Sequence, residues 1–437
     1  MNSHRILFIG LVWPEPNSSA ASQNIISYIN LFIKRGCEVT FACAAEKTEQ
    51  SASLKALGAS EQQVRLNDSS FDSFVSQLQP TIAVFDRFIS EEQFGWRVSE
   101  SAPNCLKILD CEDLHFLRDA RHKAHKAGIN GSNIELVTPY LYSDMCKREL
   151  ASILRCDLSL LLSPFELKLL HTIFGINQEI LHYCPFLIQA KEESTINSYQ
   201  DRTDFISIGS FRHAPNWDAV LTLKKQIWPI IHKAVPKAKL HIYGSYLTPK
   251  AKQLENKKEG FLVHGFTPDA FQVIRNARVL LAPLNFGAGI KGKLVDAMQC
   301  GTPSVTTAIG AEGLCLNQET LTGTNVVTAP NDLLDNWPGA IYNIDQNQES
   351  FAKAAIALYS DQEKWEQANE KAAHSINRLF DYEQQSKALL TRIERCSSNL
   401  NEHRQRNFLG QVIQHHSVMS TKYMSQWIEA KNRPLGA

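Results

Sequence analysis

The sequence predicts two doubly wound α/β domains, each built around a parallel β-sheet, followed by a helical tail. Short apolar runs, typical of buried parallel strands, alternate with helical patterns along most of the chain. The pattern restarts near Phe205, after a polar stretch at residues 191–202. The length of 437 residues also exceeds what a single hydrophobic core usually organises.

The restart divides the chain into a first domain over residues 1–195, a second over 196–395 and a tail over 396–437. Both domains open with an apolar strand, a glycine and a loop that leads into a helix. The last helix of the second domain, expected at residues 382–393, is a candidate for crossing back to the first. The tail is polar with a helical pattern, and no function is assigned to it.

Each expected element follows from local pattern. Strands are expected at residues 5–10, 38–43, 81–85 and 106–109, and at 205–209, 240–243, 261–264, 279–283 and 304–307. Helices are expected at residues 22–34, ended by Gly36, then after Pro215, and through most of 337–376. In the helix after Pro215, Trp217 and Trp228 are expected to face the core.

Charge and composition exclude several classes of protein. Lys plus Arg and Asp plus Glu both total 45, so the formal net charge is zero and no nucleic-acid partner is expected. The ten cysteines show no C-x-x-C pair and no zinc-like spacing, which favours reduced structural thiols and no metal site. The apolar run at residues 6–13 is too short to span a membrane. We therefore expect a cytoplasmic protein, with peripheral contact to the inner face of the membrane left open.

The most informative segment is a glycine-rich turn between a strand and a helix. Gly287, Gly289 and Gly292 follow the strand expected to end at residue 283, and a helix begins near Lys293. Glycines let the backbone approach phosphate oxygens, and a helix N-terminus offers free N–H donors with partial positive charge. Lys291 and Lys293 add formal charge. The segment predicts a diphosphate site; the alternative is a flexible turn with solvated lysines.

Two further features extend this site. Asp296 lies one helical turn beyond Lys293, where its carboxylate could accept hydrogen bonds from ribose hydroxyls; an ordinary exposed aspartate is the alternative. A second loop at residues 307–313 follows the next strand and is expected beside the first. Gly310 and Gly313 permit close backbone contact there, and Glu312 points inward or is solvated.

These motifs resemble those of a known family. The segments G-A-G-I-K-G-K-L-V-D-A-M-Q-C-G-T-P (287–303) and T-A-I-G-A-E-G (307–313) resemble the donor-binding signature of group 1, family 4 retaining glycosyltransferases. The loop G-S-F-R-H-A-P-N (209–216) resembles the loop that opens their C-terminal domain. The resemblance covers residues 200–395 well and the first domain more weakly.

The resemblance implies a GT-B architecture, in which two Rossmann-like domains face each other across a cleft and the C-terminal one holds most of the nucleotide-sugar donor. The implied donor-binding residues are Gly209, Gly287, Ala288, Gly289, Ile290, Gly292, Asp296, Gly310, Ala311 and Glu312. Lys291, Lys293 and Arg212 are expected to hold the diphosphate; for Arg212, the alternative is a side chain that fixes the geometry between the domains. As hypothesised for the family, the departing phosphate takes the acceptor proton, so no side-chain base and no cofactor are expected.

In the first domain, Asn17, Ser18 and Ser19 stand where many relatives carry a glycine-rich loop, and we assign them to the acceptor side. Asp113 is expected on the acceptor side as well. His115 follows the same strand and is expected near the transferred sugar, with a buried, hydrogen-bonded histidine as the equal alternative. The basic run at residues 119–126 is either a solvated helix face or a patch that faces the acceptor or a membrane.

The chain departs from the commonest family pattern, in which two glutamates are separated by seven residues. Here Ala288 and Asp296 stand at those positions. The chain contains no Asp-x-Asp, so no metal is expected, and its first strand lacks G-x-G-x-x-G, which disfavours a nicotinamide dinucleotide.

The expected function is sugar transfer, with retention, to a glycan, lipid-linked or small-molecule acceptor in surface polysaccharide or glycoconjugate synthesis. The identities of the nucleotide and the sugar do not follow from these residues. A nucleotide-sugar epimerase of the same fold and a catalytically silent donor-binding subunit are the alternatives.

Overall fold

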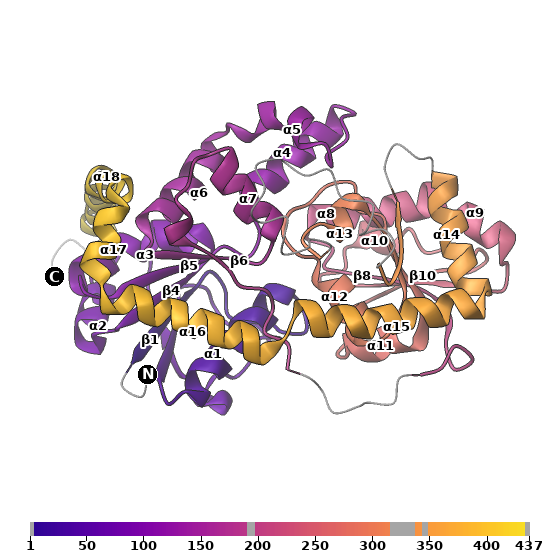
Figure 1. Cartoon of the computed structure of the whole chain (residues 1–437), viewed down its shortest axis with the longest axis horizontal. Coiled ribbons are helices and arrows are strands. Elements are labelled where there is room, and N and C mark those ends of the chain that lie inside the picture. The colour runs from indigo at the N-terminus through magenta and orange to yellow at the C-terminus, as the bar shows by residue number, and fades with distance from the viewer. Residues whose placement is uncertain (1–3, 190–196, 315–336, 343–347, 433–437) are drawn as a thin grey trace.

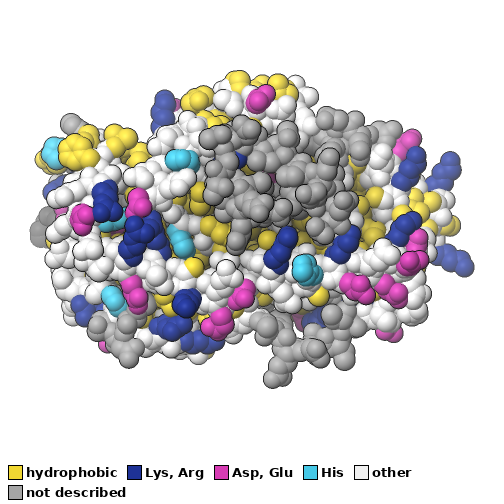
Figure 2. Space-filling model, viewed as in Figure 1, with side chains coloured by type: hydrophobic (Ala, Val, Ile, Leu, Met, Phe, Trp, Pro, Cys, Tyr) yellow, Lys and Arg dark blue, Asp and Glu magenta, His cyan; other side chains and the backbone are white. Residues whose placement is uncertain are grey.

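The computed structural model contains two parallel β-sheets covered by helices, with further helices at the C-terminal end of the chain (Figure 1). It describes residues 4–189, 197–314, 337–342 and 348–432. The predicted pair of doubly wound α/β domains with a helical tail is confirmed. Charged side chains of both signs are scattered over the face in Figure 2, in keeping with the balanced composition.

The first sheet has the strand order β3-β2-β1-β4-β5-β6-β7 and parallel pairing throughout. Its strands are β1 (Arg5–Gly10), β2 (Glu38–Cys43), β3 (Ser60–Gln63), β4 (Ile82–Asp86), β5 (Leu106–Asp110), β6 (Leu158–Leu161) and β7 (Leu181–Tyr183). The sequence did not predict β3, β6 or β7. β3 reads Ser-Glu-Gln-Gln at one edge and β7 has three residues at the other, so neither carries an apolar strand pattern.

The second sheet has the order β10-β9-β8-β11-β12-β13. Its strands are β8 (Thr203–Ile208), β9 (Leu240–Tyr243), β10 (Phe261–Gly265), β11 (Ala277–Ala282), β12 (Ser304–Thr307) and β13 (Gly339–Tyr342). β13 corrects the prediction of a helical pattern from residue 337, because these residues pair with the open edge of β12. Gly339 makes that pairing close: a Cβ there would lie 2.0 Å from the carbonyl oxygen of Ser304.

Helices cover both sheets. Those of the first domain are α1 (Ala20–Lys34), α2 (Ser70–Leu78), α3 (Arg87–Ser101), α4 (His115–Lys126), α5 (Ile134–Leu141), α6 (Asp144–Arg155) and α7 (Pro164–Thr172). Those of the second are α8 (Ala214–Thr222), α9 (Trp228–Ala234), α10 (Pro249–Lys252), α11 (Ala270–Asn276), α12 (Gly292–Gln299), α13 (Ala308–Ala311), α14 (Gln348–Ser360) and α15 (Gln362–Leu379). A π-helical segment at Leu223–Ile227 joins α8 to α9. Trp228 is fully buried and Trp217 packs partly buried on the same core, as the sequence predicted.

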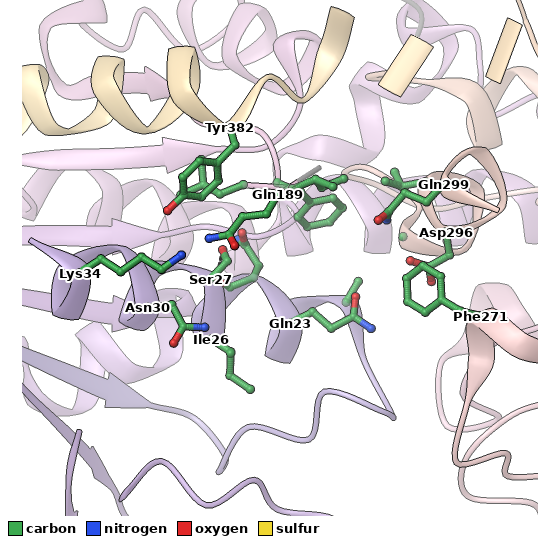
Figure 3. A pocket seen from close by; sticks show the side chains of 17 residues that line it. Gln23, Ile26, Ser27, Asn30, Lys34, Gln189, Phe271, Asp296, Gln299 and Tyr382 are labelled. Carbon is green, nitrogen blue, oxygen red and sulfur yellow. Dashed lines mark hydrogen bonds between the residues drawn. The ribbon is translucent and has the colours of Figure 1, made fainter. Parts of the chain in front are cut away.

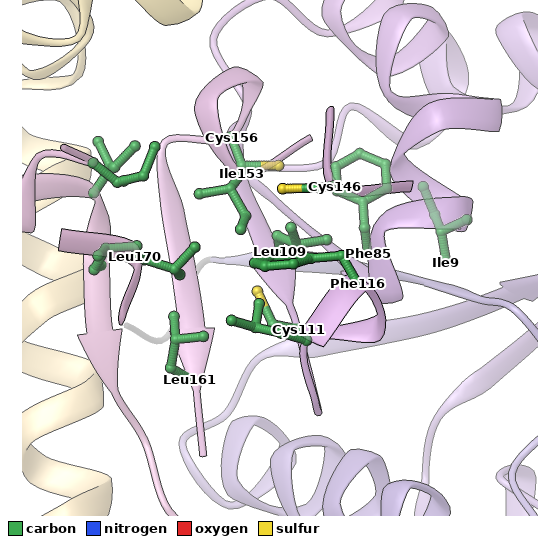
Figure 4. Close-up of a cluster of buried hydrophobic side chains, with 14 of the residues drawn as sticks. Ile9, Phe85, Leu109, Cys111, Phe116, Cys146, Ile153, Cys156, Leu161 and Leu170 are labelled. Carbon is green, nitrogen blue, oxygen red and sulfur yellow. The ribbon is translucent and has the colours of Figure 1, made fainter. Parts of the chain in front are cut away.

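Two apolar clusters sandwich the first sheet. Residues such as Leu109 and Phe116 pack α2, α3, α4, α6 and α7 on one face (Figure 4). On the other face, α1 and α16 (Tyr382–Ser398) pack on Phe8 and its neighbours. α16 follows α15 of the second domain and crosses to the first, where Leu389 and Ile393 join the cluster (Figure 1). The nine cysteines that the structure describes are buried, eight of them in these two clusters and Cys300 in a cluster of the second domain.

The tail, α17 (Leu400–Arg406) and α18 (Phe408–Asn432), lies on α3 and α6 of the first domain. Arg404 anchors it. Its guanidinium donates to both carboxylate oxygens of the buried Asp157, at 2.8 and 3.0 Å, and to the carbonyl oxygens of Pro103 and Cys105. Among the described helices, none is both long and apolar enough to cross a bilayer.

We expect Arg404→Ala to destabilise the first domain by roughly 3 kcal/mol, because it leaves the buried Asp157 carboxylate without its cationic partner. Arg406→Ala, which removes an exposed pair with Glu402, is the matched control and is expected to cost less than about 0.5 kcal/mol. Urea unfolding monitored by circular dichroism measures both. Equal losses in the two variants would contradict the anchoring role of Arg404.

Candidate functional site

The glycine-rich turn lies at the junction of the two domains, between the carboxyl end of β11 and the start of α12. A Cβ on Gly289, whose φ is +63°, would lie 2.6 Å from the Cβ of Asp113. A Cβ on Gly292 would lie 2.5 Å from the Cβ of Ala20, at the start of α1. The backbone of the turn therefore touches the first domain, and any larger side chain at either position would push the domains apart.

Lys293 is held beside the loop that follows β8. Its ammonium donates to the Oδ1 atom of Asn216 at 2.8 Å, and a Cβ on Gly209 would lie 2.7 Å from its Nζ atom. Burial, with a further contribution from Lys291, lowers the pKa of Lys293 to about 7. The absence of a side chain at Gly209 thus creates the space in which this ammonium sits.

Lys291 is the residue that precedes the first turn of α12, and its side chain folds back onto the glycine-rich turn. Its ammonium donates to the carbonyl oxygen of Gly289 at 2.6 Å. Burial lowers the pKa of Lys291 to about 8, against the opposing effect of Glu312 and with a further lowering by Arg121. The protonated form of both lysines is thus destabilised in the free protein, and an anion bound beside them would stabilise it.

Arg121, from α4 of the first domain, clamps the turn from the other side. Its side chain has 0% exposure. It donates to the carbonyl oxygen of Gly287 at 2.9 Å and binds both carboxylate oxygens of Glu312, at 2.7 and 2.6 Å. The Glu312 side chain therefore points inward, which was one of the two possibilities that the sequence left open. Its partner is an arginine of the first domain.

The basic run at residues 119–126 is accordingly divided between two surroundings. Besides Arg121, His122 and His125 stack on Phe286, with ring centroids 4.3 and 5.5 Å apart. Lys123 and Lys126 are exposed. Three of the five basic side chains of the run therefore contact the second domain, a role that neither of the two sequence alternatives included.

A buried carboxyl group, Glu166 of α7, meets the turn directly. Its Oε1 atom accepts hydrogen bonds from the backbone N–H of Gly289 at 2.7 Å and of Leu114 at 3.2 Å. Burial, and next the nearby Asp113, raises the pKa of Glu166 to about 8. One of the turn amides predicted to bind phosphate is thus already held by a first-domain residue.

His115 begins α4 and lies beside Asp113. Its Nε2 atom is 3.6 Å from Asp113 Oδ1, and its ring packs edge-on against Phe88. Burial lowers the pKa of His115 to about 4, so the ring is neutral near pH 7. Although burial opposes it, Arg118 lowers the pKa of Asp113 well below its ordinary value, with help from His115.

His213, which sequence reasoning did not single out, belongs to the same electrostatic cluster. It stands on the loop after β8 and keeps contact with solvent. Desolvation lowers the pKa of His213 to about 4, against an opposing effect of Asp113, and both Lys291 and Lys293 add to the lowering. His213 and Lys291 therefore both interact with Asp113 across the junction, and the His213 ring is neutral near pH 7.

More carboxyl groups line the carboxyl ends of β4 and β5. Arg87 binds both oxygens of Asp86, at 2.8 and 2.7 Å. Asn24 of α1 donates to Glu112 at 2.9 Å, and burial raises the pKa of Glu112 to about 7. Burial and the adjacent Glu112 raise the pKa of Asp110 well above its usual range. The signal for these groups was available, since acidic residues end two successive strands.

The acceptor-side serines make local contacts. Ser19 caps α1 by accepting a hydrogen bond from the N–H of Ser22, and the hydroxyl of Ser18 donates to Gln50; Asn17 is exposed. Arg212 is also exposed and stacks on the ring of Tyr246, with its Cζ atom 3.7 Å from the ring centroid.

Tyr246 in turn donates to Glu15 of the first domain at 2.7 Å. Arg212 therefore belongs to a second contact between the domains, formed around Tyr246.

Asp296 lines a cavity of about 560 Å³ between α1, residues 186–189, α12 and the start of α16 (Figure 3). Most of the polar side chains that line the cavity are amides, namely Gln23, Asn24, Asn30, Gln189 and Gln299. Lys34 and Tyr382 close the far side. Lys291 and Lys293 are not part of this lining.

Ala288, at the position of the usual first glutamate, is buried in the apolar cluster of the first domain. Ile290 packs beside Leu162, also of the first domain. A carboxylate at residue 288 would have to enter that apolar cluster, which is costly without a partner. The alanine is therefore matched to its surroundings.

The second loop is compact. The hydroxyl of Thr307 caps α13 by accepting from the N–H of Gly310 at 3.1 Å, and donates to the carbonyl oxygen of Leu284 at 2.5 Å. A Cβ on Gly310 would lie 1.9 Å from Thr306 Oγ1, so only glycine fits there. Ala311 is buried beside it. The loop packs next to the glycine-rich turn, as predicted from its position after the neighbouring strand.

The overall architecture is that of GT-B proteins. Anabaena HepE in complex with UDP and glucose superposes with a TM-score of 0.61 at 12% identity, over 90% of this chain and 99% of that one. A glycosyltransferase from Rickettsia africae gives 0.61 at 11% identity, over 91% and 100%. WaaG, a glycosyltransferase involved in lipopolysaccharide biosynthesis, gives 0.59 at 12% identity, over 87% and 98%. The predicted GT-B fold is thereby confirmed.

Residues 202–361 match the sequence model of the family described as Glycosyl transferases group 1. The matched segment spans the second sheet and the glycine-rich turn. No curated protein matches the chain by sequence.

Glu166 generates a prediction about stability. Because its pKa in the folded protein is raised above that of the unfolded chain, its contribution to stability is full at low pH and is lost as the pH rises to about 8. The melting temperature of the wild type relative to Glu166→Gln is therefore expected to fall between pH 5 and pH 8, then level off. Glutamine keeps an acceptor for the two amides.

The exposed Glu49→Gln is the control and is expected to show no such trend. A wild-type curve parallel to that of Glu166→Gln over the whole range would show that Glu166 is not held protonated.

Proposed function

We propose that this protein is a retaining glycosyltransferase that moves a sugar from a nucleoside diphosphate sugar to an acceptor hydroxyl. The observation that carries the proposal is the pair of half-buried ammonium groups, Lys291 and Lys293, gathered where the glycine-rich turn becomes α12. A helix N-terminus and two cations stabilise the negative charge that develops on a departing diphosphate.

The comparisons support a nucleotide-sugar donor. The second domain matches the group 1 glycosyltransferase model, and HepE, which shares the fold, was solved with UDP and with UDP-glucose. TarM, another GT-B protein, was solved with UDP, fondaparinux and α-GlcNAc-glycerol, which supports a glycan acceptor. From what these neighbours bind, we also propose that this protein acts in surface polysaccharide or glycoconjugate synthesis at the cytoplasmic face of the membrane. If the acceptor is lipid-linked, the proposal includes peripheral contact of the protein with the membrane.

The cavity beside Asp296 fits the nucleoside part of the donor. Its volume of about 560 Å³ lies within the range of small-ligand sites, and its amides match the donors and acceptors of a base and a ribose. In this proposal the ribose hydroxyls donate to Asp296, and the diphosphate passes over the N-terminus of α12 to reach Lys291 and Lys293. The base would then lie between α1 and α12.

The chemistry needs few groups. The acceptor hydroxyl attacks the sugar on the face that the nucleotide leaves, and the departing phosphate takes its proton. The lysines and turn amides stabilise that phosphate, and no metal or cofactor enters the proposal. His115 is kept neutral, so it can donate or accept a hydrogen bond from a sugar hydroxyl without carrying charge. Domain closure through Arg121 removes water from the reacting atoms.

A donor-binding subunit without catalysis is the second candidate. Ala288 replaces a carboxylate that relatives use, and the N–H of Gly289 is held by Glu166. Binding of nucleoside diphosphates without turnover across a broad panel of acceptors would favour it. Incubation with the donor alone tests the epimerase alternative, because an isomerised nucleotide sugar would appear without any acceptor.

Lys293→Ala is expected to weaken binding of the nucleoside diphosphate and to lower kcat/KM for transfer by about 10²–10³-fold, as for loss of one preorganised donor. A thermal-shift screen of UDP, GDP, ADP and their sugars first selects the ligand. Lys233→Ala, on the exposed side of α9, is the matched control and is expected to leave both unchanged. Wild-type turnover and affinity in Lys293→Ala would remove the assignment.

The lowered pKa values predict a pH dependence. Because Lys293 loses its proton near pH 7 in the free protein and Lys291 near pH 8, binding of a nucleoside diphosphate must take up protons as the pH rises. The Kd for UDP, or for whichever diphosphate the screen selects, is expected to rise between pH 7 and pH 9.

Lys293→Arg, whose guanidinium stays protonated, is expected to reduce that slope by up to one proton per binding event. Isothermal titration calorimetry in two buffers of different ionisation enthalpy counts these protons. Identical slopes for the wild type and Lys293→Arg would contradict the role of Lys293.

A further inference from the structure

The long tail helix α18 packs on the first domain through its polar side. Arg97 donates to the hydroxyl of Ser425 at 2.9 Å, and Lys107 donates to Gln414 Oε1 at 3.1 Å. Nearer the start, a Cβ on Gly410 would lie 2.0 Å from the carbonyl oxygen of Leu154, so the helix approaches α6 closely there. α18 is thus attached by small and polar residues, the reverse of an ordinary amphipathic surface helix.

The opposite side of α18 presents large apolar side chains to solvent. These are Phe408, Leu409, Val412, Met419, Tyr423, Met424 and Trp427, with exposed fractions between 39% and 69%. At about 100° per residue they fall within an arc of about 160°. Figure 2 shows apolar side chains gathered at the end of the molecule where Figure 1 places α18. Monomeric proteins rarely leave such a contiguous patch uncovered.

We propose that this apolar face is a homodimer interface, in which α18 pairs with α18 of a second copy of the chain. Seven side chains of this size and exposure present on the order of 800 Å², which matches the roughly 800 Å² that each partner buries in a standard interface. The 25-residue helix is about 37 Å long. The patch alone is therefore large enough for a stable pair.

The order of the side chains suits a twofold arrangement. In an antiparallel pair, Trp427 and Tyr423 of one copy meet Phe408 and Val412 of the other, and Met419 lies near the axis. A twofold interface needs only one surface that is complementary to itself, and aromatic residues and methionine are enriched in interface cores.

Charge distinguishes this partner from a lipid surface. Helices that adsorb to anionic membranes carry a basic polar face that meets the headgroups. α18 has only Lys422, Glu429 and Lys431, and Lys422 forms an ion pair with Glu100 at 2.7 Å. The side of α18 that carries Gln414, Lys422 and Ser425 lies against the first domain. α18 also stands at the end of the first domain away from the second, so pairing leaves the domain junctions of both copies uncovered (Figure 1).

The test measures the oligomeric state of the full chain by sedimentation velocity between about 1 and 50 µM. We expect a dimer for the wild type, and at least a ~100-fold weaker association for the double variant Tyr423→Glu/Trp427→Glu. Gln411→Glu, at an exposed position of α18 outside the apolar arc, is the matched control and stays dimeric. Because the replaced side chains are exposed in the monomer, circular dichroism is expected to show an unchanged fold.

A second variant checks the geometry independently. Met419→Cys is expected to cross-link two copies with a short bismaleimide, since residue 419 lies near the twofold axis. A monomeric wild type, a dimer that survives the double variant, or a monomer that floats with vesicles of phosphatidylcholine and phosphatidylglycerol would each overturn the proposal. These outcomes do not depend on glycosyltransferase activity.

Discussion

The domain junction depends on Arg121, whose guanidinium is withdrawn from water between the two sheets. Burying this charge is affordable only because Glu312 binds it at two points and the carbonyl oxygen of Gly287 accepts a further hydrogen bond. All three of these acceptor atoms belong to the second domain. Gly131 of the first domain accepts one more hydrogen bond from Arg121, at 3.0 Å, but the ion pair with Glu312 forms only when the domains are together, which fixes the glycine-rich turn against α4.

This closure explains the unusual residues of the turn. Gly289 and Gly292 meet Asp113 and Ala20 so closely that no side chain fits, and Ala288 enters an apolar cluster of the first domain. A glutamate at residue 288 would be buried there without a partner. The departure from the family pattern and the tightness of the junction thus have one physical cause, the close approach of the turn to the first domain.

The same closure sets the electrostatics of the candidate site. Burial lowers the pKa values of Lys291 and Lys293 and raises that of Glu166. The two lysines therefore lose their protons more easily than exposed lysines do, and the carboxyl group keeps its proton to a higher pH. A diphosphate would supply the missing negative charge. A site arranged in this way favours an anion strongly because its own groups are poorly solvated without one.

Sequence alone determined the parallel-sheet architecture and the positions of most apolar strands along the chain, and it singled out the glycine-lysine turn, because buried strands and such motifs are local patterns. It did not reveal β3, β7 or β13, whose strand character comes from neighbours rather than composition, and it also missed the short apolar strand β6. It also could not place Arg121 and Glu166, which are over a hundred residues from their partners in the turn. Only folding brings those groups together, because their roles depend on burial at a junction that no local pattern encodes.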